Sequence, residues 1–313
     1  PAPAPAPAPI PVAAVAVAAT APSPPPASNP NVLDDLADVF GATAMSPPQP
    51  TAAPAMAAPA STVTPQQIIQ WSNECCVKPE GVLYEDGALQ IGIKGKYNAA
   101  QAQIGIFFGN RTQTPVCGLQ LNVESNDMLQ CSTSFPPTFT GDIAPSKQCQ
   151  ATVAATCLNP YHGLPRLVVN FTRGGAPVTL DLQLPTSVNK FVNPNPVSGP
   201  EFMMQWNAIG NGDERHAMEV VDVNPKWMEM SNVERLCTTG LRMAVIPAQD
   251  LQGVNPANTV MANGTLTTAQ QAFSCQLVVE FNRLSAKLRV SCRSDHPSLT
   301  KATLQLFTTQ VTG

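Results

Sequence analysis

Proline is concentrated at the start of this chain and limits what that part can fold into. Residues 1–65 hold 17 of the 33 prolines and begin with a proline–alanine alternation. Proline fixes φ and lacks a backbone N–H, so such a stretch builds neither a helix nor a strand ladder. Burying alanine, its commonest apolar residue, does not offset the entropy lost on ordering the chain. We therefore expect residues 1–65 to form an extended, semi-rigid tether.

One segment inside this tether has a different composition. Residues 32–40 read VLDDLADVF and contain the only three charged residues of the first 65. Leu33, Leu36 and Phe40 recur at helical spacing with the aspartates between them. An acidic and hydrophobic segment of this kind can fold onto the groove of a partner, and clathrin is one candidate. The alternative is a chance cluster of apolar residues.

The remaining 248 residues are enough for one large domain or two small ones. Their net charge is only −1, and without a basic surplus nucleic acid is not an expected partner. The sequence has no run of about 18 apolar residues, so we expect no membrane insertion. Residues 10–21 are apolar but lack the basic start of a signal peptide. A first residue other than Met suggests a fragment of a longer protein.

Short apolar runs separated by turn residues dominate the chain up to about residue 193. Residues 66–71 are a candidate short helix, and residues 82–84 and 89–93 flank an acidic turn as in a β-hairpin. Further strands are expected at residues 103–108, 118–123, 151–157, 166–171 and 178–184. Short alternating strands at this spacing predict an antiparallel β-sandwich.

Helical signals join the strands after residue 193. Ser198 can cap a helix with Pro200 in its first turn, and Gly210 would end it. Its apolar face would consist of Phe202, Met203, Trp206 and Ile209. A capping box from Ser231 to Glu234 predicts a second helix ending at residue 240, and a last helix follows residue 295. With strands at 241–246, 259–266, 273–281 and 287–292, this half is predicted to be α+β.

The sequence shows no arrangement typical of a catalytic or metal site. The three histidines lie far apart, the nine cysteines form no CxxC pair, and no glycine-rich phosphate loop precedes a helix. We therefore predict a protein that is not an enzyme and uses no metal or cofactor, with buried free thiols. Two alternatives stay open: a hydrolase with a Cys–His pair, and a secreted, disulfide-containing sandwich on a proline-rich stalk. The odd cysteine count and three N-x-T sequons bear on the second.

The most informative side chain of the second half is Trp206. Glu280 and Arg289 would face each other if their strands are antiparallel neighbours, and Arg293 follows on the same strand. A tryptophan beside basic groups suits a ligand with an aromatic anchor and a carboxylate. The alternatives are a core tryptophan and a solvated surface ion pair, which contributes about 0 to 1 kcal/mol.

Several segments in the correct order resemble the appendage, or ear, of the alpha-adaptin family. They are GVLYEDGALQIGIK at 81–94, GIFFGNRT at 105–112, LPTSVNKFVNP at 184–194, FMMQW at 202–206 and VNPAN at 254–258. The resemblance implies a disordered hinge over residues 1–78, an immunoglobulin-like β-sandwich over 79–193 and an α/β platform over 194–313. It covers nearly the whole folded part.

The resemblance also implies two peptide-binding sites. The platform site, for Asp-Pro-Phe/Trp and Phe-x-Asp-x-Phe motifs, corresponds to Phe202, Met203, Trp206, Glu280, Arg289 and Arg293. The sandwich site, for Trp-x-x-Phe motifs, corresponds to Lys94, Phe107, Gly109 and Gln148. Two positions depart from the family pattern: Met203 replaces an aromatic residue and Val278 an arginine. We expect a platform that still takes aromatic anchors but selects less strongly for acid.

The function implied by the resemblance is recruitment. A member of this family would bind endocytic accessory proteins at clathrin-coated pits on the cytoplasmic side of the plasma membrane, and would join other adaptor subunits through a trunk that precedes the hinge. Single contacts would be weak, and multivalency would supply the strength. The nearest alternative is the appendage of another adaptor large chain acting at an internal membrane.

Overall fold

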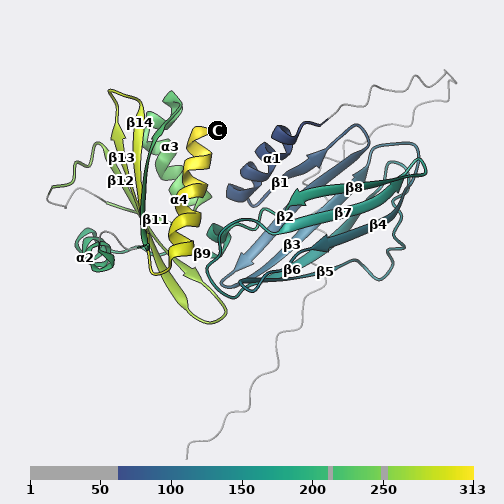
Figure 1. Cartoon of the computed structure of the whole chain (residues 1–313), viewed down its shortest axis with the longest axis horizontal. Coiled ribbons are helices and arrows are strands. Elements are labelled where there is room, and N and C mark those ends of the chain that lie inside the picture. The colour runs from purple at the N-terminus through teal and green to yellow at the C-terminus, as the bar shows by residue number, and fades with distance from the viewer. Residues whose placement is uncertain (1–62, 211–213, 248–252) are drawn as a thin grey trace, which may run out of the picture. The chain divides into compact units, whose positions relative to one another are not determined.

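The computed structural model describes residues 63–210, 214–247 and 253–313 (Figure 1). The proline-rich tether and the segment at 32–40 lie outside these residues. The first element is helix α1 (Pro65–Val77), where Thr64 and Gln67 form a capping box and Pro65 occupies the first turn.

Helix α1 corrects the expectation that a disordered linker extends to residue 78. Cys75 and Cys76 are buried, and Ile68 packs against the main hydrophobic core. The thiol of Cys75 donates to the carbonyl of Val82 at 3.5 Å. The helix therefore persists because it has an apolar face to bury, although its six-residue beginning was all that the sequence suggested.

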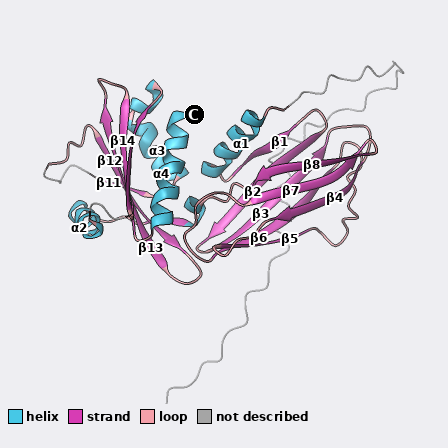
Figure 2. Cartoon of the chain, in the orientation of Figure 1, coloured by secondary structure: helices cyan, strands magenta, loops and turns pink. Residues whose placement is uncertain are grey.

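Two antiparallel sheets form the first half of the described chain (Figure 2). One sheet has the strand order β1-β2-β3-β6-β5, and the other has the order β4-β7-β8. In β3 the even-numbered residues Ala102, Ile104, Ile106 and Phe108 are buried, so these side chains face the core and the odd-numbered ones face outwards. The strands are β1 (Glu80–Glu85), β2 (Leu89–Asn98), β3 (Gln101–Asn110), β4 (Val116–Val123), β5 (Leu129–Ser134), β6 (Gln148–Cys157), β7 (Arg166–Arg173) and β8 (Ala176–Gln183).

A further antiparallel sheet follows, with the order β10-β14-β13-β12-β11, and β9 also pairs with β12. All three residues of β9 pair with β12, so this sheet begins at Val192, just before the expected division at 193/194. Its strands are β9 (Val192–Pro194), β10 (His216–Asp222), β11 (Ala244–Ile246), β12 (Thr259–Thr267), β13 (Ala272–Asn282) and β14 (Lys287–Ser294).

Helices lie on both faces of this sheet (Figure 1). Helix α4 (Pro297–Thr312) buries Leu299, Phe307 and Val311 on one side, and α2 (Gly199–Ile209) lies on the other. Helix α3 (Met230–Arg235) starts one residue before Ser231 and continues as a turn over Leu236–Gly240. The expected capping box at Ser231 is therefore wrong, because a 3₁₀ turn over Pro225–Met228 brings the chain into the helix earlier.

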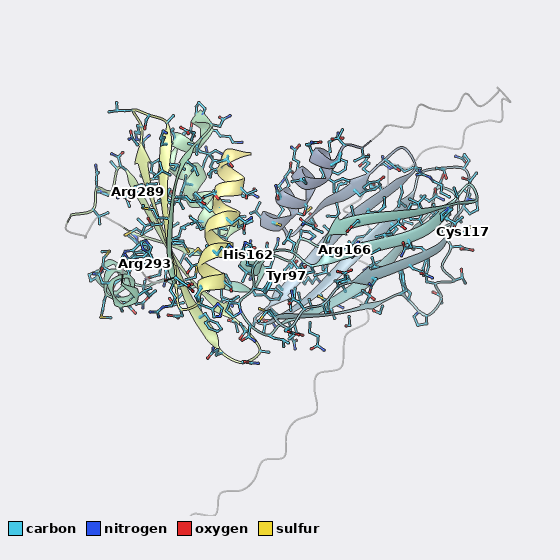
Figure 3. All side chains as sticks on the ribbon, in the orientation of Figure 1. Tyr97, Cys117, His162, Arg166, Arg289 and Arg293 are labelled. Atoms are coloured by element: carbon cyan, nitrogen blue, oxygen red, sulfur yellow. The ribbon has the colours of Figure 1, made fainter. Side chains whose placement is uncertain are left out.

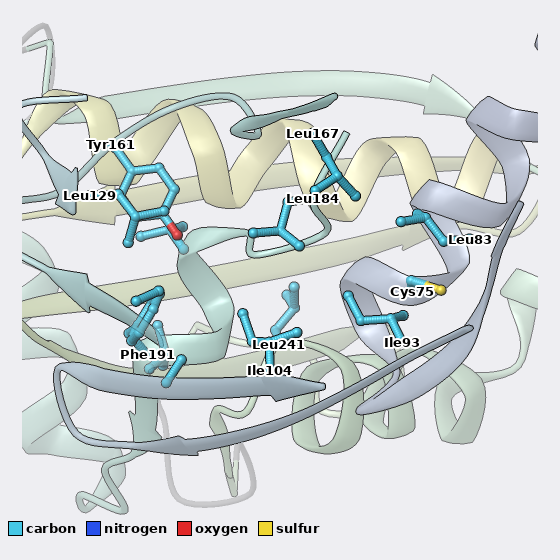
Figure 4. Packing of buried hydrophobic residues seen from close by; sticks show 14 of the residues in the cluster. Cys75, Leu83, Ile93, Ile104, Leu129, Tyr161, Leu167, Leu184, Phe191 and Leu241 are labelled. Atoms are coloured by element: carbon cyan, nitrogen blue, oxygen red, sulfur yellow. The ribbon is translucent and has the colours of Figure 1, made fainter. Parts of the chain in front are cut away.

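The main core joins side chains from α1, both sandwich sheets and the inner face of the later sheet (Figure 4). Its members in that figure include Cys75, Leu83, Ile104, Leu167 and Leu241. All nine cysteines are free thiols, and the sulfur atoms of Cys275 and Cys292 lie 3.9 Å apart. Helix α2 is separate from this core, and a small cluster of its own holds it to the outer face of the sheet.

Candidate functional site

Helix α2 places the candidate tryptophan. The side chain of Ser198 accepts a hydrogen bond from the Glu201 N–H, and Gly210 ends the helix with a positive φ of 75°. Phe202 points inwards against Met261 and Ile246 and is 0% exposed. Trp206 lies one turn later and stays partly exposed, with its ring stacked on that of Phe202 at a centroid separation of 5.9 Å. The buried phenylalanine therefore supports the exposed indole from below.

Arg293 lies against the indole of Trp206. The centre of its guanidinium is 4.4 Å from the ring centroid, and its Nη1 donates to the Trp206 carbonyl. The carbonyl belongs to the last turn of α2, where cations are favourable. Burial lowers the pKa of Arg293. This arginine therefore fixes the tryptophan by a cation–π contact and a charge-assisted hydrogen bond.

His216 completes the surroundings of the tryptophan. Its ring meets that of Trp206 edge-on at 6.4 Å, and its strand register places it opposite Arg293. Burial, and to a smaller extent the charge of Arg293, lower the pKa of His216. The ring is therefore biased towards its neutral form, which adds apolar surface to the site.

The structure brings Glu280 and Arg289 together as the sequence suggested. They are opposite each other in the β13–β14 register, and Nε and Nη2 of Arg289 each donate to the carboxylate at 2.5 Å. These hydrogen bonds raise the pKa of Arg289. Both side chains remain partly exposed to solvent, so the pair forms a charged rim and contributes little to stability.

A hollow of about 510 Å³ lies between these groups. Its apolar wall consists of Met203, Met218, Met261 and Val278, and Trp206 closes one side. Arg289 and Arg293 supply the positive charge of the lining (Figure 3). Five of the six predicted platform residues line the hollow, and Phe202 is the exception because it lies beneath the surface.

His216, Met218 and Met261 were missed at this site. They lie on β10 and β12, and the sequence did not reveal which strands neighbour β13 and β14. The strand register in the structure shows these neighbours: Met218 pairs with Ser291, Ser291 with Val278, and Val278 with Met261. The alternation of strand side chains then puts this row on the face that carries α2.

The four predicted sandwich residues share the outer face of β2, β3 and β6. Gly109 is opposite Gln148, and Lys94 is opposite Gly105. Phe107 is only 8% exposed on this outward face, because its ring lies over Gly105, where an added Cβ would come within 3.1 Å of a ring carbon. Nζ of Lys94 is 3.1 Å from the Glu80 carboxylate.

A second hollow borders this face. It has a volume of about 320 Å³ and is lined by Phe139, Lys147, Gln148 and Gln150, among others. The ring of Phe107, which lies over Gly105, and this hollow form a shallow surface. Such a surface suits a short peptide better than a small molecule, which binds in a more enclosed pocket.

In the part of the chain that the structure describes, no three His, Cys, Asp or Glu side chains come together as possible metal ligands. His162 bonds Gln305, and His296 accepts from the N–H of Ser298 at the start of α4. None of the described helices combines the length and the apolar content needed to cross a membrane.

Comparison with known proteins gives the same division of the chain into two parts. Residues 79–186 match the family described as adaptin C-terminal domain, and residues 190–311 match the family described as alpha adaptin AP2, C-terminal domain. The sequence is 27% identical over 248 residues to AP-2 complex subunit alpha-2 of Dictyostelium discoideum, covering 77% of this chain and 24% of that protein.

Two further relatives agree. The chain is 28% identical to AP-2 complex subunit alpha-1 of Arabidopsis thaliana, covering 72% of this chain and 21% of that protein. It is 24% identical to AP-2 complex subunit alpha of Schizosaccharomyces pombe, covering 72% and 25%. The chain thus spans about a quarter or less of the length of these relatives.

Proposed function

This chain belongs to the alpha-adaptin C-terminal appendage family, and from that premise we propose that it recruits accessory proteins to clathrin coats by binding their short linear motifs. The action is binding alone, without catalysis. It takes place at coated pits on the cytoplasmic side of the plasma membrane, during endocytosis. Other adaptor subunits would hold the chain there through a trunk preceding residue 1, and the segment at 32–40 is a candidate contact for clathrin.

The observation that carries the platform assignment is the partly exposed indole of Trp206 beside a hollow. An aromatic side chain of a ligand can stack on this indole while its neighbouring carboxylate approaches the arginines of the lining. Arg293 already lies against the indole and Arg289 already bonds Glu280, so both cations are held in place before a ligand arrives. Preorganisation of this kind reduces the entropy lost on binding.

Val278 sets how strongly the platform selects for acid. It lies in the middle of the row Met261–Val278–Ser291, where a guanidinium would face the ligand directly. We expect the chain to bind an Asp-Pro-Trp peptide only about twofold to threefold more tightly than an Asn-Pro-Trp peptide. In Val278→Arg the ratio should rise to about tenfold or more, because a charge-assisted hydrogen bond contributes about 1.5 kcal/mol or more. Fluorescence anisotropy titrations of both peptides measure the ratio.

Each outcome of this titration bears on the proposal. Saturable binding of Asp-Pro-Trp with weak acid selectivity supports it. Absence of saturable binding to the unaltered chain would refute the platform function. An acid preference above tenfold in the unaltered chain would instead show that the existing arginines suffice, and that Val278 does not set selectivity.

The sandwich face supports a second peptide contact. Gly109 leaves the surface open between Gln90 and Gln148, and an added Cβ would meet no atom closer than 4.0 Å. We expect Gly109→Val to fold normally but to weaken binding of a Trp-x-x-Phe peptide about tenfold, because its side chain would stand where the peptide lies. Isothermal titration calorimetry measures the loss.

Gln103→Val is the matched control for this variant. Gln103 is exposed on the same outward face of β3, six residues from Gly109. The control should bind the Trp-x-x-Phe peptide like the unaltered chain, and Gly109→Val should keep its affinity for Asp-Pro-Trp. Equal Trp-x-x-Phe affinity in Gly109→Val and the unaltered chain would rule out this face as the binding surface.

Both contacts are small compared with a standard protein–protein interface, so each should be weak and quickly reversible. Strength would arise when one accessory protein carries several motifs and meets several appendages on the same coat. Two sites on separate faces fit this mode of action, because one chain can then engage two motifs together.

A further inference from the structure

Strand β10 forms an edge of the platform sheet. It is the first strand in the order β10-β14-β13-β12-β11, and among the described residues no other strand pairs with its outer side. An edge strand offers unpaired backbone groups to any extended segment that lies beside it. Proteins usually protect such edges with charge or prolines. β10 carries the acids Glu219 and Asp222, but it also exposes two large apolar side chains, Met218 and Val220, and these call for an explanation.

The hydrogen bonds at the two ends of β10 show which of its residues direct their backbone groups to β14 and which to the open edge. The carbonyl of Arg215 accepts from the Ser294 N–H at 3.1 Å, and the Val223 N–H donates to the Ala286 carbonyl at 3.2 Å. Both residues have odd numbers, and hydrogen-bonded residues alternate along an antiparallel pair. The odd-numbered residues of β10 therefore bond β14. The even-numbered residues, including Met218 and Val220, direct their N–H and C=O groups to the open edge.

The same even-numbered residues carry apolar side chains on the face of the hollow. Met218 is 52% exposed and lines the hollow, and Val220 is 59% exposed one row further along. Their partners in β14 are Ser291 and Arg289, which lie on that face too. The edge thus combines available backbone groups, exposed apolar side chains and a nearby cation, in direct continuation of the Trp206 site.

We propose that β10 is a strand-pairing subsite for the peptides that bind the platform. The occupant is an extended segment of an accessory protein, with its aromatic anchor beside Trp206 and His216. An aliphatic residue two or four positions from the anchor lies over Met218 or Val220, because every second residue of a paired strand shares one face. A residue three positions away faces the opposite side of the sheet. This inference rests on the proposed function of the platform.

A set of peptides, each with one leucine at a different position, tests the subsite. A fluorescent peptide containing Asp-Pro-Trp in an otherwise alanine and serine sequence is the parent, and single leucines replace the residues two, three or four positions from the tryptophan, on either side. On one side, leucine at positions two and four should tighten binding about tenfold, and leucine at position three should not. The side that responds reports the direction of the paired peptide.

The variant Val220→Thr gives a more specific test of the subsite, because threonine keeps the branched shape of valine and removes apolar surface. It should abolish the gain from leucine at position four and leave both the parent affinity and the gain at position two unchanged. Leu284→Thr, at a fully exposed residue in the β13–β14 turn, is the control and should change none of these values.

The outcomes separate the subsite from the platform function. Binding of the parent with equal affinity for all leucine peptides would overturn the subsite alone, and so would a gain that survives Val220→Thr. Failure of the unaltered chain to bind the parent would overturn both. A sedimentation measurement showing that the chain dimerises, and that Val220→Thr prevents it, would assign the edge to a second copy and overturn the peptide subsite.

Discussion

Trp206→Ala is expected to weaken binding of an Asp-Pro-Trp peptide at least about thirtyfold, which corresponds to about 2 kcal/mol. The indole is the largest surface of the hollow available to a ligand aromatic, and its position is fixed by Phe202 below and Arg293 beside it. Alanine would remove the stacking partner and leave the guanidinium of Arg293 without its aromatic contact. Fluorescence anisotropy with a labelled peptide measures the change.

Met204→Ala is the matched control. Met204 lies on the same helix two residues earlier, and its side chain is 67% exposed and does not line the hollow. The control should bind the peptide with the affinity of the unaltered chain, which shows that helix α2 is intact. The Trp-x-x-Phe peptide should bind both variants equally. Indistinguishable Asp-Pro-Trp affinities of Trp206→Ala and Met204→Ala would place the aromatic anchor elsewhere.

The local signals of helix α2 predicted it well. Ser198, Pro200 and Gly210 occupy the expected cap, first-turn and end positions. The pairing of Glu280 with Arg289 was also predictable, because a short turn between two strands forces an antiparallel register. These features depend on residues close in sequence, and the sequence carries that information directly.

The sequence could not show which residues on one apolar helix face are buried and which stay exposed. Phe202 and Trp206 are separated by one helical turn and looked equivalent, but the first is buried and the second is partly exposed. The difference arises because β12 supplies Met261 beneath Phe202, whereas Trp206 packs at the margin of the same cluster and contacts Arg293 and His216. Such neighbours come from strands that are distant in sequence.

Helix α1 was underestimated for a related reason. The proline-rich stretch ends at Pro65, whereas the family resemblance placed the end of the hinge at residue 78. The helix has few strong local signals beyond its capping box, and its stability depends on burying Cys75 and Cys76 against residues such as Val82 and Ser187. Only the folded domain provides those contacts.

Phe202→Ala is expected to have the largest effect on stability at the platform site. Replacing a fully buried phenylalanine with alanine costs about 3 to 5 kcal/mol. Among the described residues, the cluster that holds α2 contains two other buried members, Ile246 and Met261, and it is separate from the main core. We therefore expect the loss to appear as local detachment of α2 rather than unfolding of the whole domain.

Hydrogen bonds from two residues of the sheet oppose this detachment. Nε2 of Gln276 donates to the Phe202 carbonyl at 3.2 Å and to Oε1 of Gln205 at 3.4 Å, and Arg293 donates to the Trp206 carbonyl. Each hydrogen bond between neutral groups contributes about 1 kcal/mol, and the one from the charged guanidinium about 1.5 to 3 kcal/mol. Their sum does not exceed about 5 kcal/mol, which is the upper limit of the expected loss of stability in Phe202→Ala. Detachment would also release Trp206, and peptide affinity should fall as it does in Trp206→Ala.

Hydrogen exchange distinguishes local detachment from global unfolding. In Phe202→Ala, amides of α2 should exchange about a hundredfold faster or more, whereas those of α4, which packs on the other face of the sheet, should change much less. Phe202→Leu keeps most of the apolar volume and should show a smaller increase confined to α2. Equal acceleration in α2 and α4 would mean that the small cluster and the main core unfold as one unit, and the independence of the α2 attachment would have to be abandoned.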